Sequence, residues 1–147
     1  MNEKWHIRFI QLAKEVSKWS KDPSTKIGAI IVGSKGQILA QGYNGFPRKI
    51  KDTPKRLNDR ELKYKYVVHA EMNAIFNASY SGTTIDGATL YAYGLPICHE
   101  CAKGIIQVGI KKVVIEKHNG NYKQHWKESC DLAITMFQEA GVEVYEV

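Results

Sequence analysis

The hydrophobic and polar positions of the N-terminal segment repeat with the period of an α-helix. Apolar residues recur at intervals of three and four between residues 3 and 19, which predicts one amphipathic helix. The KDPS that follows ends this helix, since Pro23 disfavours helical backbone at the residue before it. The β-rich runs KIGAIIVG and QILAQGYN come next, and the short SKG between them predicts a hairpin. The first run is almost continuously apolar, which predicts a strand buried on both faces.

The second half of the chain alternates between helical and extended patterns. We expect helices over residues 69–80, 98–109 and 121–141, and strands over residues 88–94, 111–116 and 142–147. Residues 45–66 hold two prolines and many charges, so we expect this segment to be irregular. The order of elements predicts an α/β fold with a mixed five-stranded sheet and helices on both faces, in one domain of residues 1–147.

Composition and charge limit the functions that the chain can have without selecting one. A length of 147 residues with 44% hydrophobic and 24% charged residues is typical of one globular domain. The net charge of +6 suits an anionic partner, and the basic residues gather between residues 47 and 65, either as solvated surface or as a flap near a phosphate. No apolar run approaches the ~20 residues of a membrane span. The N-terminal segment is amphipathic and contains acidic residues, unlike a signal or transit peptide, so we expect a cytoplasmic protein.

Candidate metal ligands stand at the starts of two of the predicted helices. Cys98 and Cys101 are three residues apart, which places both side chains on one face of a helix. The N-terminus of that helix favours negative charge and helps to hold both sulfurs as thiolates. His69 opens another helix and offers a nitrogen ligand. Three protein ligands leave one position of a tetrahedral zinc ion open for water, as in catalytic zinc sites.

Glu71 lies two residues after His69, on the first turn of the same predicted helix. A carboxylate there can take a proton from a zinc-bound water and pass it to a substrate. Ligation of the ion by Glu71 is less favourable, because two thiolates and a carboxylate would crowd negative charge around it. We therefore expect Glu71 to act as a general acid and base.

Two other uses of the cysteines stay open at this point. A Cys-x-x-Cys pair can be redox-active, although such pairs usually stand in a thioredoxin-like pattern that is not seen here. A closed structural zinc needs a fourth ligand. His99 points away from the face that the two cysteines share, and the spacing favours none of His118, His125 and Cys130. Cys130 lies in a helical stretch, which favours an ordinary packed thiol.

The two parts, His69-Ala70-Glu71 and Cys98-x-x-Cys101, resemble the zinc-binding motif of nucleobase deaminases. Within that superfamily the chain is most similar to the deoxycytidylate (dCMP) deaminase family, and the resemblance covers about residue 3 to residue 147. The segments that carry it are DPSTKIGAIIV (22–32), GYNGFPR (42–48), VVHAEMNAI (67–75) and CAKGIIQVGIKKVV (101–114).

The resemblance implies the three-layer α/β/α fold of cytidine deaminases and hydrolytic deamination of dCMP to dUMP, which supplies dUMP for thymidylate synthesis. It implies one zinc ion per chain, held by His69, Cys98 and Cys101. A zinc-activated water attacks C4 of cytosine, while Glu71 moves protons to ring atom N3 and to the departing amine. His6 alone offers a metal ligand near the N-terminus, so we expect no second zinc.

The resemblance also implies contacts with the nucleotide. Asn44 matches the asparagine that contacts the sugar in this superfamily, with a plain turn residue as the alternative. The backbone at Ala70 meets the base edge. Lys26, with Ser24 nearby, is the first candidate for the 5′-phosphate. Arg48 is a candidate for the same phosphate or for an effector.

The chain departs from the family at two positions. Ile97 separates Pro96 from Cys98, where the family usually has proline directly before the cysteine. Lys49 stands where relatives often carry glycine, beside the GYNG segment that regulated members use to bind dCTP or dTTP, so regulation is an open question. The family is usually oligomeric, and we expect a homo-oligomer, with a hexamer favoured; the tryptophans at 5, 19 and 126 can serve subunit contacts or the core.

Other functions stay open on the sequence alone. The zinc core also suits a nucleic-acid deaminase such as a tRNA adenosine deaminase, although GYNG argues against it. A deaminase that also accepts dCTP or deoxycytidine, and a zinc-stabilised partner protein without activity, are further alternatives.

Overall fold

The structure is a computed structural model that describes residues 2–147. The elements are α1 (Glu3–Ser17), β1 (Gly28–Val32), β2 (Ile38–Tyr43), α2 (Pro54–Asn58), α3 (Arg60–Tyr66), α4 (Ala70–Tyr80), β3 (Thr89–Tyr93), α5 (His99–Gln107), β4 (Lys112–Ile115), α6 (Gln124–Ala140) and β5 (Glu143–Glu146). Each helix and strand expected from the pattern is present within three residues of its expected bounds. Over residues 2–147, no helix is both long enough and apolar enough to cross a membrane.

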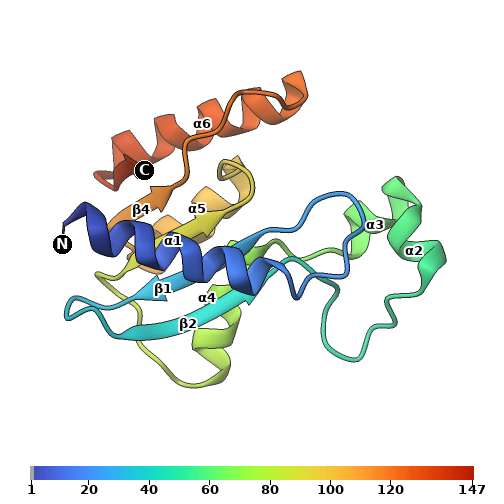
Figure 1. The fold of residues 1–147 in the computed structure, drawn as a ribbon, viewed down its shortest axis with the longest axis horizontal. Coiled ribbons are helices and arrows are strands. Elements are labelled where there is room, and N and C mark those ends of the chain that lie inside the picture. The colour runs from blue at the N-terminus through green and yellow to red at the C-terminus, as the bar shows by residue number, and fades with distance from the viewer. Residues whose placement is uncertain (1) are drawn as a thin grey trace.

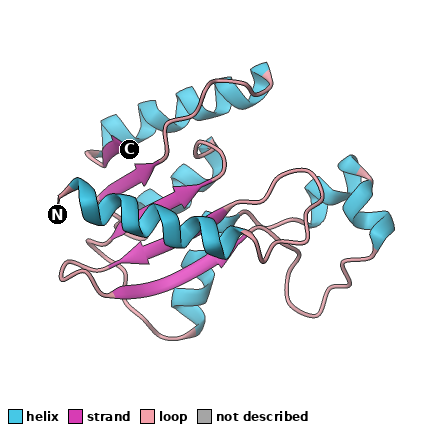
Figure 2. Ribbon diagram, in the orientation of Figure 1, coloured by secondary structure: helices cyan, strands magenta, loops and turns pink. Residues whose placement is uncertain are grey.

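The five strands form one mixed sheet in the order β2-β1-β3-β4-β5 (Figure 2). Strand β1 runs antiparallel to both of its neighbours, β2 and β3, whereas β3, β4 and β5 run parallel. Ala29 in the middle of the sheet pairs with Gly42 on one side and with Ala92 on the other. The predicted mixed five-stranded sheet is confirmed. The parallel strands are joined through α5 and α6, as parallel pairs require.

Helices cover both faces of the sheet, so the predicted three-layer α/β/α arrangement is confirmed (Figure 1). Helix α1 packs on one face, where Ile30 and Val32 of β1 join its apolar side chains. Helices α4, α5 and α6 pack on the other face, where Ala29 and Ile31 point. All five residues of β1 are buried, as its continuous apolar run predicts.

The expectation of an irregular segment over residues 45–66 is wrong for its second half, which forms α2 and α3. Thr53 caps α2 by accepting a hydrogen bond from the N–H of Arg56, and Pro54 occupies the first turn. Asp59 caps α3 by accepting hydrogen bonds from the backbone N–H groups of Glu61 and Leu62. Two capping signals are therefore present in a segment whose high charge hides any apolar period.

Lys49 adopts a left-handed backbone conformation, with a φ of 69°, and it is the one non-glycine residue with a positive φ among residues 2–147. This region of φ favours glycine, because a Cβ atom crowds the following carbonyl group there. The structure thus gives a physical reason why glycine suits this position, and it shows that the chain makes the turn with lysine.

Helix α4 lies directly on strand β2 because Gly42 has no side chain. A Cβ atom at Gly42 would overlap the backbone nitrogen of Ala74 and the backbone oxygen of Ala70. The overlap is with backbone, so neither neighbour can rotate away. Gly42 therefore sets the distance between the sheet and the first turn of α4.

We expect Gly42→Ala to destabilise the protein by at least about 1–3 kcal/mol, because the added methyl forces α4 away from β2. For a domain of this size this lowers the melting temperature by several degrees, about 2–4 °C per kcal/mol. Gly45→Ala is the control, since a Cβ atom there meets only the ring of Tyr43 at 4.0 Å. Equal melting temperatures for the two variants would contradict the close approach.

His6 of α1 is buried against the sheet, where its ring lies 5.0 Å from that of Tyr145 in β5 and its Nδ1 lies 2.8 Å from the hydroxyl of Tyr91 in β3. Burial lowers the pKa of His6, and the nearby Lys112 lowers it further. The folded state thus binds this proton less readily than the unfolded state. The contribution of His6 to the free energy of unfolding is therefore fully present above the pKa of an unfolded histidine, about 6.5. It is lost as the pH falls from there through the lower pKa of the folded state.

We expect the melting temperature of the native protein to fall more steeply than that of His6→Asn between about pH 7.5 and about pH 5.5. The control is His125→Asn, which removes an exposed histidine on α6. Thermal melts across this range give the slopes. A native slope equal to that of His6→Asn would show that protonation of His6 does not oppose folding.

Candidate functional site

His69 is placed by the end of β2 and by a single bridge to the segment before α4. Val68 pairs with Gly45 through two backbone hydrogen bonds, and the side chain of Asn73 donates to the carbonyl oxygen of Tyr43 at 2.8 Å. His69 itself is the N-cap residue of α4, with an extended ψ of 155°. Its side chain makes no capping hydrogen bond, so the ring turns toward the start of α5 instead.

Cys98 is the N-cap residue of α5, and its sulfur accepts a hydrogen bond from the backbone N–H of Cys101 at 3.4 Å. The next residue, His99, is turned toward α6, because its backbone N–H and its Nδ1 both meet Oγ of Ser129. The prediction that His99 points away from the two cysteines is confirmed. Ile97, the extra residue of this loop, is buried in the core beneath it.

Helices α4 and α5 approach each other closely beside the site. A Cβ atom at Gly104 of α5 would overlap the thioether of Met72 in α4. The glycine leaves room for the side chain of Met72 between the two helices. This contact was not foreseen from the sequence, and the glycine inside a helical pattern is the signal that could have suggested it.

His69, Cys98 and Cys101 form the one cluster of potential metal ligands found across residues 2–147. Nδ1 of His69 lies 3.4 Å from Sγ of Cys98 and 3.3 Å from Sγ of Cys101, and the three ligand atoms lie within 4.8 Å of one another. Ligands bound to tetrahedral zinc at its usual bond lengths lie about 3.6 Å apart. One nitrogen and two sulfurs in this geometry fit one zinc ion per chain.

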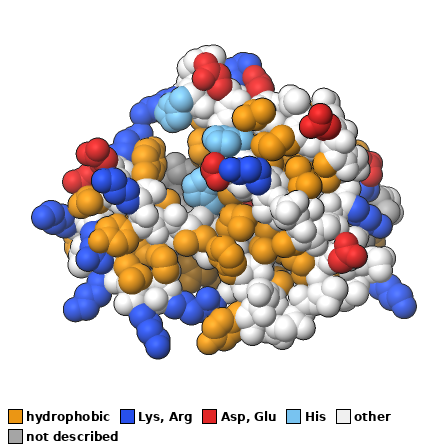
Figure 3. Space-filling view, turned by 180° about the vertical axis from the view of Figure 1, so that it is seen from behind, with side chains coloured by type: hydrophobic (Ala, Val, Ile, Leu, Met, Phe, Trp, Pro, Cys, Tyr) orange, Lys and Arg blue, Asp and Glu red, His pale blue; other side chains and the backbone are white. Residues whose placement is uncertain are grey.

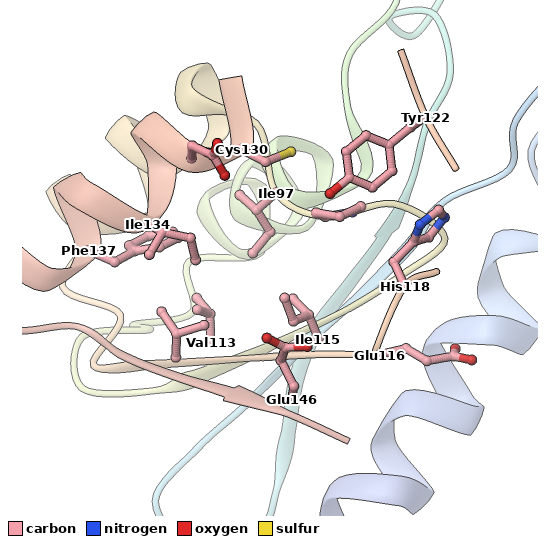
Figure 4. Close-up of a pocket in the computed structure, with 13 residues that line it drawn as sticks. Ile97, Val113, Ile115, Glu116, His118, Tyr122, Cys130, Ile134, Phe137 and Glu146 are labelled. Carbon is pink, nitrogen blue, oxygen red and sulfur yellow. The ribbon is translucent and has the colours of Figure 1, made fainter. Parts of the chain in front are cut away.

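Within residues 2–147 no fourth His, Cys, Asp or Glu joins the cluster, which leaves one position of a tetrahedral ion open. None of His118, His125 and Cys130 belongs to it within the described part of the chain. Figure 4 shows Cys130 and His118 on the wall of a separate cavity of about 280 Å³, which lies between α6 and strands β4 and β5. The closed structural zinc that the sequence left open therefore finds no fourth ligand among these three residues.

The charge of the cluster favours a cation. The pKa of Cys98 is lowered to about 4, because Cys101 and then His69 hydrogen bond to its sulfur. The pKa of His69 is raised, chiefly by the same hydrogen bond to Cys98. The lowered pKa favours the thiolate form of Cys98, which is the form that binds metal, whereas the hydrogen bond to Cys98 and burial raise the pKa of Cys101.

Glu71 is buried beside this cluster without being part of it. Glu71 is only 3% exposed, and its Oε1 has no hydrogen-bond partner within the described residues. Burial raises the pKa of Glu71 to about 7. A carboxyl group with a pKa near neutrality can both accept and donate a proton, and its unpartnered oxygen is available to a bound water or substrate.

The candidate substrate residues lie around the same end of the sheet, with different side-chain environments. Ser24 and Lys26 are exposed on the turn before β1, and the backbone of Lys26 packs against Gly94, where the loop toward Cys98 begins. Asn44 is buried, and its amide bonds the N–H of Ile27 and the carbonyl of Thr25. The amide therefore fixes the turn before β1, whatever else it binds.

Ala70 and Arg48 occupy contrasting positions. Ala70 is fully buried as the first residue of α4, where backbone N–H groups have no partner inside the helix. Arg48 reaches along α4 to the side-chain oxygen of Asn77 and covers the ring of Tyr80 at 5.0 Å. The structure thus places Arg48 two turns along α4 from the metal cluster.

Trp126 of α6 stands next to His69, with ring centroids 6.2 Å apart. Its indole nitrogen is buried and has no hydrogen-bond partner in the part of the chain that the structure describes. The sequence suggested only a core or contact residue here. Figure 3, which views the molecule from behind the orientation of Figure 1, shows histidine side chains beside a hollow.

Comparisons with known proteins agree with this geometry. Residues 3–117 match the model of the cytidine and deoxycytidylate deaminase zinc-binding region. An uncharacterised deaminase from the luxG 3′ region of Aliivibrio fischeri is 39% identical over 144 residues, which cover 98% of this chain and 94% of that protein. Human deoxycytidylate deaminase is 39% identical over 143 residues, which cover 94% of this chain and 76% of that protein.

The fold is also similar to that of solved structures. The dCMP deaminase of cyanophage S-TIM5, crystallised with dCMP and dUMP, superposes with a TM-score of 0.79 at 30% identity, over 100% of this chain and 99% of that one. The family resemblance expected from the motifs is confirmed: the chain belongs to the cytidine and deoxycytidylate deaminase family.

Proposed function

We propose that this protein hydrolyses dCMP to dUMP and ammonia, within one catalytic domain of residues 1–147. The observation that carries the proposal is the buried carboxyl group of Glu71, with a pKa near 7 and one unpartnered oxygen, beside a three-ligand zinc cluster. The similarity to human and cyanophage deoxycytidylate deaminases supports dCMP as the substrate.

Glu71 moves the protons of this reaction. When bound, zinc lowers the pKa of its water toward about 7 and so supplies a nucleophile at neutral pH. The residues of this chain move two protons in turn. Glu71 takes the first proton of the attacking water and passes it to N3 as the water oxygen bonds to C4. Glu71 then takes the second proton from the hydroxyl group on C4 and passes it to the amine, so the bond from C4 to the amine breaks, ammonia leaves and the C4 carbonyl forms.

The nucleotide is held by the loops around the cluster. We assign the base edge to the backbone of Ala70, the sugar to Asn44, and the 5′-phosphate to Ser24 and Lys26. The last two fit this role because they are exposed and the Lys26 backbone packs against Gly94. Arg48 suits an effector better than this phosphate, because Asn77 and Tyr80 already hold its guanidinium on the outer part of α4.

Three wider features stay predictions. These are assembly into a homo-oligomer with a hexamer favoured, binding of dCTP or dTTP as effectors, and a cytoplasmic location. The basic segment between residues 47 and 65 is where an effector phosphate finds the most positive charge.

We expect Glu71→Gln to lower kcat by at least about 10²–10⁴-fold, because the amide cannot carry the proton. The zinc content is expected to stay at one ion per chain, since Glu71 is not a ligand. The matched control is Glu100→Gln, an exposed carboxylate on the first turn of α5 that pairs with Lys103. Native turnover in Glu71→Gln, or loss of its zinc, would contradict the assigned role.

Steady-state ammonia release from dCMP, CMP, dCTP, deoxycytidine and a tRNA anticodon stem tests the proposed substrate. We expect the highest kcat/KM for dCMP, because deoxycytidine lacks the 5′-phosphate assigned to the turn before β1, CMP differs at the sugar assigned to Asn44, and dCTP carries two further phosphates. A preference for the tRNA stem, or equal rates with deoxycytidine, would overturn the proposed specificity.

A further inference from the structure

Lys63 and Asp22 form a buried ion pair that the proposed reaction does not use. Nζ of Lys63 lies 3.1 Å from Oδ1 of Asp22, and the two side chains are only 8% and 10% exposed. Lys63 belongs to α3, and within residues 2–147 it is the one buried lysine. The partners are 41 residues apart in the sequence, so the pair connects two distant segments.

A buried pair of this kind is better explained by positioning than by stability. Removing two charges from water is unfavourable, and their attraction offsets this only when the geometry is good and other hydrogen bonds are made. Asp22 makes such further hydrogen bonds, because its Oδ1 also accepts from the backbone N–H of Ser24 at 2.8 Å and from that of Thr25 at 3.1 Å. The carboxylate thus shapes the turn that carries the two phosphate candidates.

The hydrogen bonds continue from this turn toward the metal cluster. The carbonyl oxygen of Thr25 accepts from the amide of Asn44 at 2.9 Å, and the same amide accepts the N–H of Ile27 at 2.8 Å. The hydroxyl of Ser20 donates to the carbonyl oxygen of Asn44 at 2.8 Å. These buried groups lock the turn to the end of β2.

The segment from Asn44 to Gly45 links this turn to the residue before His69. Gly45, next to Asn44, exchanges two hydrogen bonds with Val68, which immediately precedes His69. Helix α3, which holds Lys63, ends one residue before Val67 and so leads into the same segment. The turn of residues 22–26 is therefore tied to the metal cluster from two sides, through Asn44 and through Lys63.

We propose that Lys63 is a positioning residue that sets the affinity for the 5′-phosphate of the substrate, by neutralising Asp22 and holding the turn with Ser24 and Lys26 in place. This inference rests on the proposed function. Without Lys63, Asp22 is an unpaired buried carboxylate next to the phosphate. The turn then rearranges to hydrate the charge, and the charge repels the phosphate. The base site and the metal cluster keep their positions, because the backbone hydrogen bonds between Gly45 and Val68, which do not involve Lys63, still hold the segment before His69.

The test uses Lys63→Met, which keeps the length of the side chain without its charge. Its matched control is Lys65→Met, which removes an exposed charge from the same helix. We expect Lys63→Met to raise the KM for dCMP and the inhibition constant of dUMP at least about tenfold. The inhibition constant of deoxyuridine, which lacks the phosphate, and the zinc content are expected to match those of the native protein.

The double variant Asp22→Asn/Lys63→Met separates positioning from direct binding. The asparagine oxygen still accepts the N–H groups of Ser24 and Thr25, and no unpaired charge is left. We expect this variant to recover most of the affinity for dUMP. It also provides the test if Lys63→Met alone does not fold, because it leaves no unpaired buried charge. A double variant as weak as the single one would show that the charge of Lys63 itself binds the phosphate, which overturns the inference.

Equal weakening of dUMP and deoxyuridine in Lys63→Met would likewise overturn it, because the defect would then be general. Native affinities in Lys63→Met would do the same. Failure of the proposed function is a separate result, because the native protein itself would then not deaminate dCMP.

Discussion

The meeting of two helix N-termini at one point is the constraint on which the rest of the site depends. His69 is the N-cap residue of α4 and Cys98 is the N-cap residue of α5, and a glycine stands at each of two contacts behind them. Gly42 lets the backbone of α4 lie on the sheet, and Gly104 leaves room for the side chain of Met72 between α4 and α5. The ligands of one zinc ion thus come from segments about thirty residues apart, and metal binding favours the folded chain because only the fold assembles them.

Glu71 takes its properties from burial beside this meeting point. It lies on the first turn of α4 with 3% of the residue exposed, and burial raises the pKa of its carboxyl group to about 7. An unpartnered buried oxygen is unfavourable for stability. Such a group in a native protein calls for an explanation, and a catalytic role is one of those known. The burial that destabilises the carboxylate is what fits it to move protons near neutral pH.

Much of this could be predicted from the sequence, because the informative residues act locally. The periods of two and 3.6 gave the five strands and the longer helices, and the spacing of His69, Glu71 and the cysteines indicated the ligands and the acid. Helices α2 and α3 were missed because charged residues hide their period, although Thr53 and Asp59 are good caps. The pair of Lys63 with Asp22 joins residues 41 positions apart, and no local pattern encodes it. The buried state of Asn44 depends in the same way on Ser20 and Thr25.

The most direct measurement is a crystal structure of the protein with dUMP, with anomalous data collected on both sides of the zinc absorption edge. The account predicts one zinc peak per chain, bonded to Nδ1 of His69 and to the sulfurs of Cys98 and Cys101. Its fourth ligand comes from solvent or nucleotide, and Oε1 of Glu71 lies within hydrogen-bond distance of N3 of the base. A fourth ligand supplied by the protein, or Glu71 turned away from the base, would contradict it.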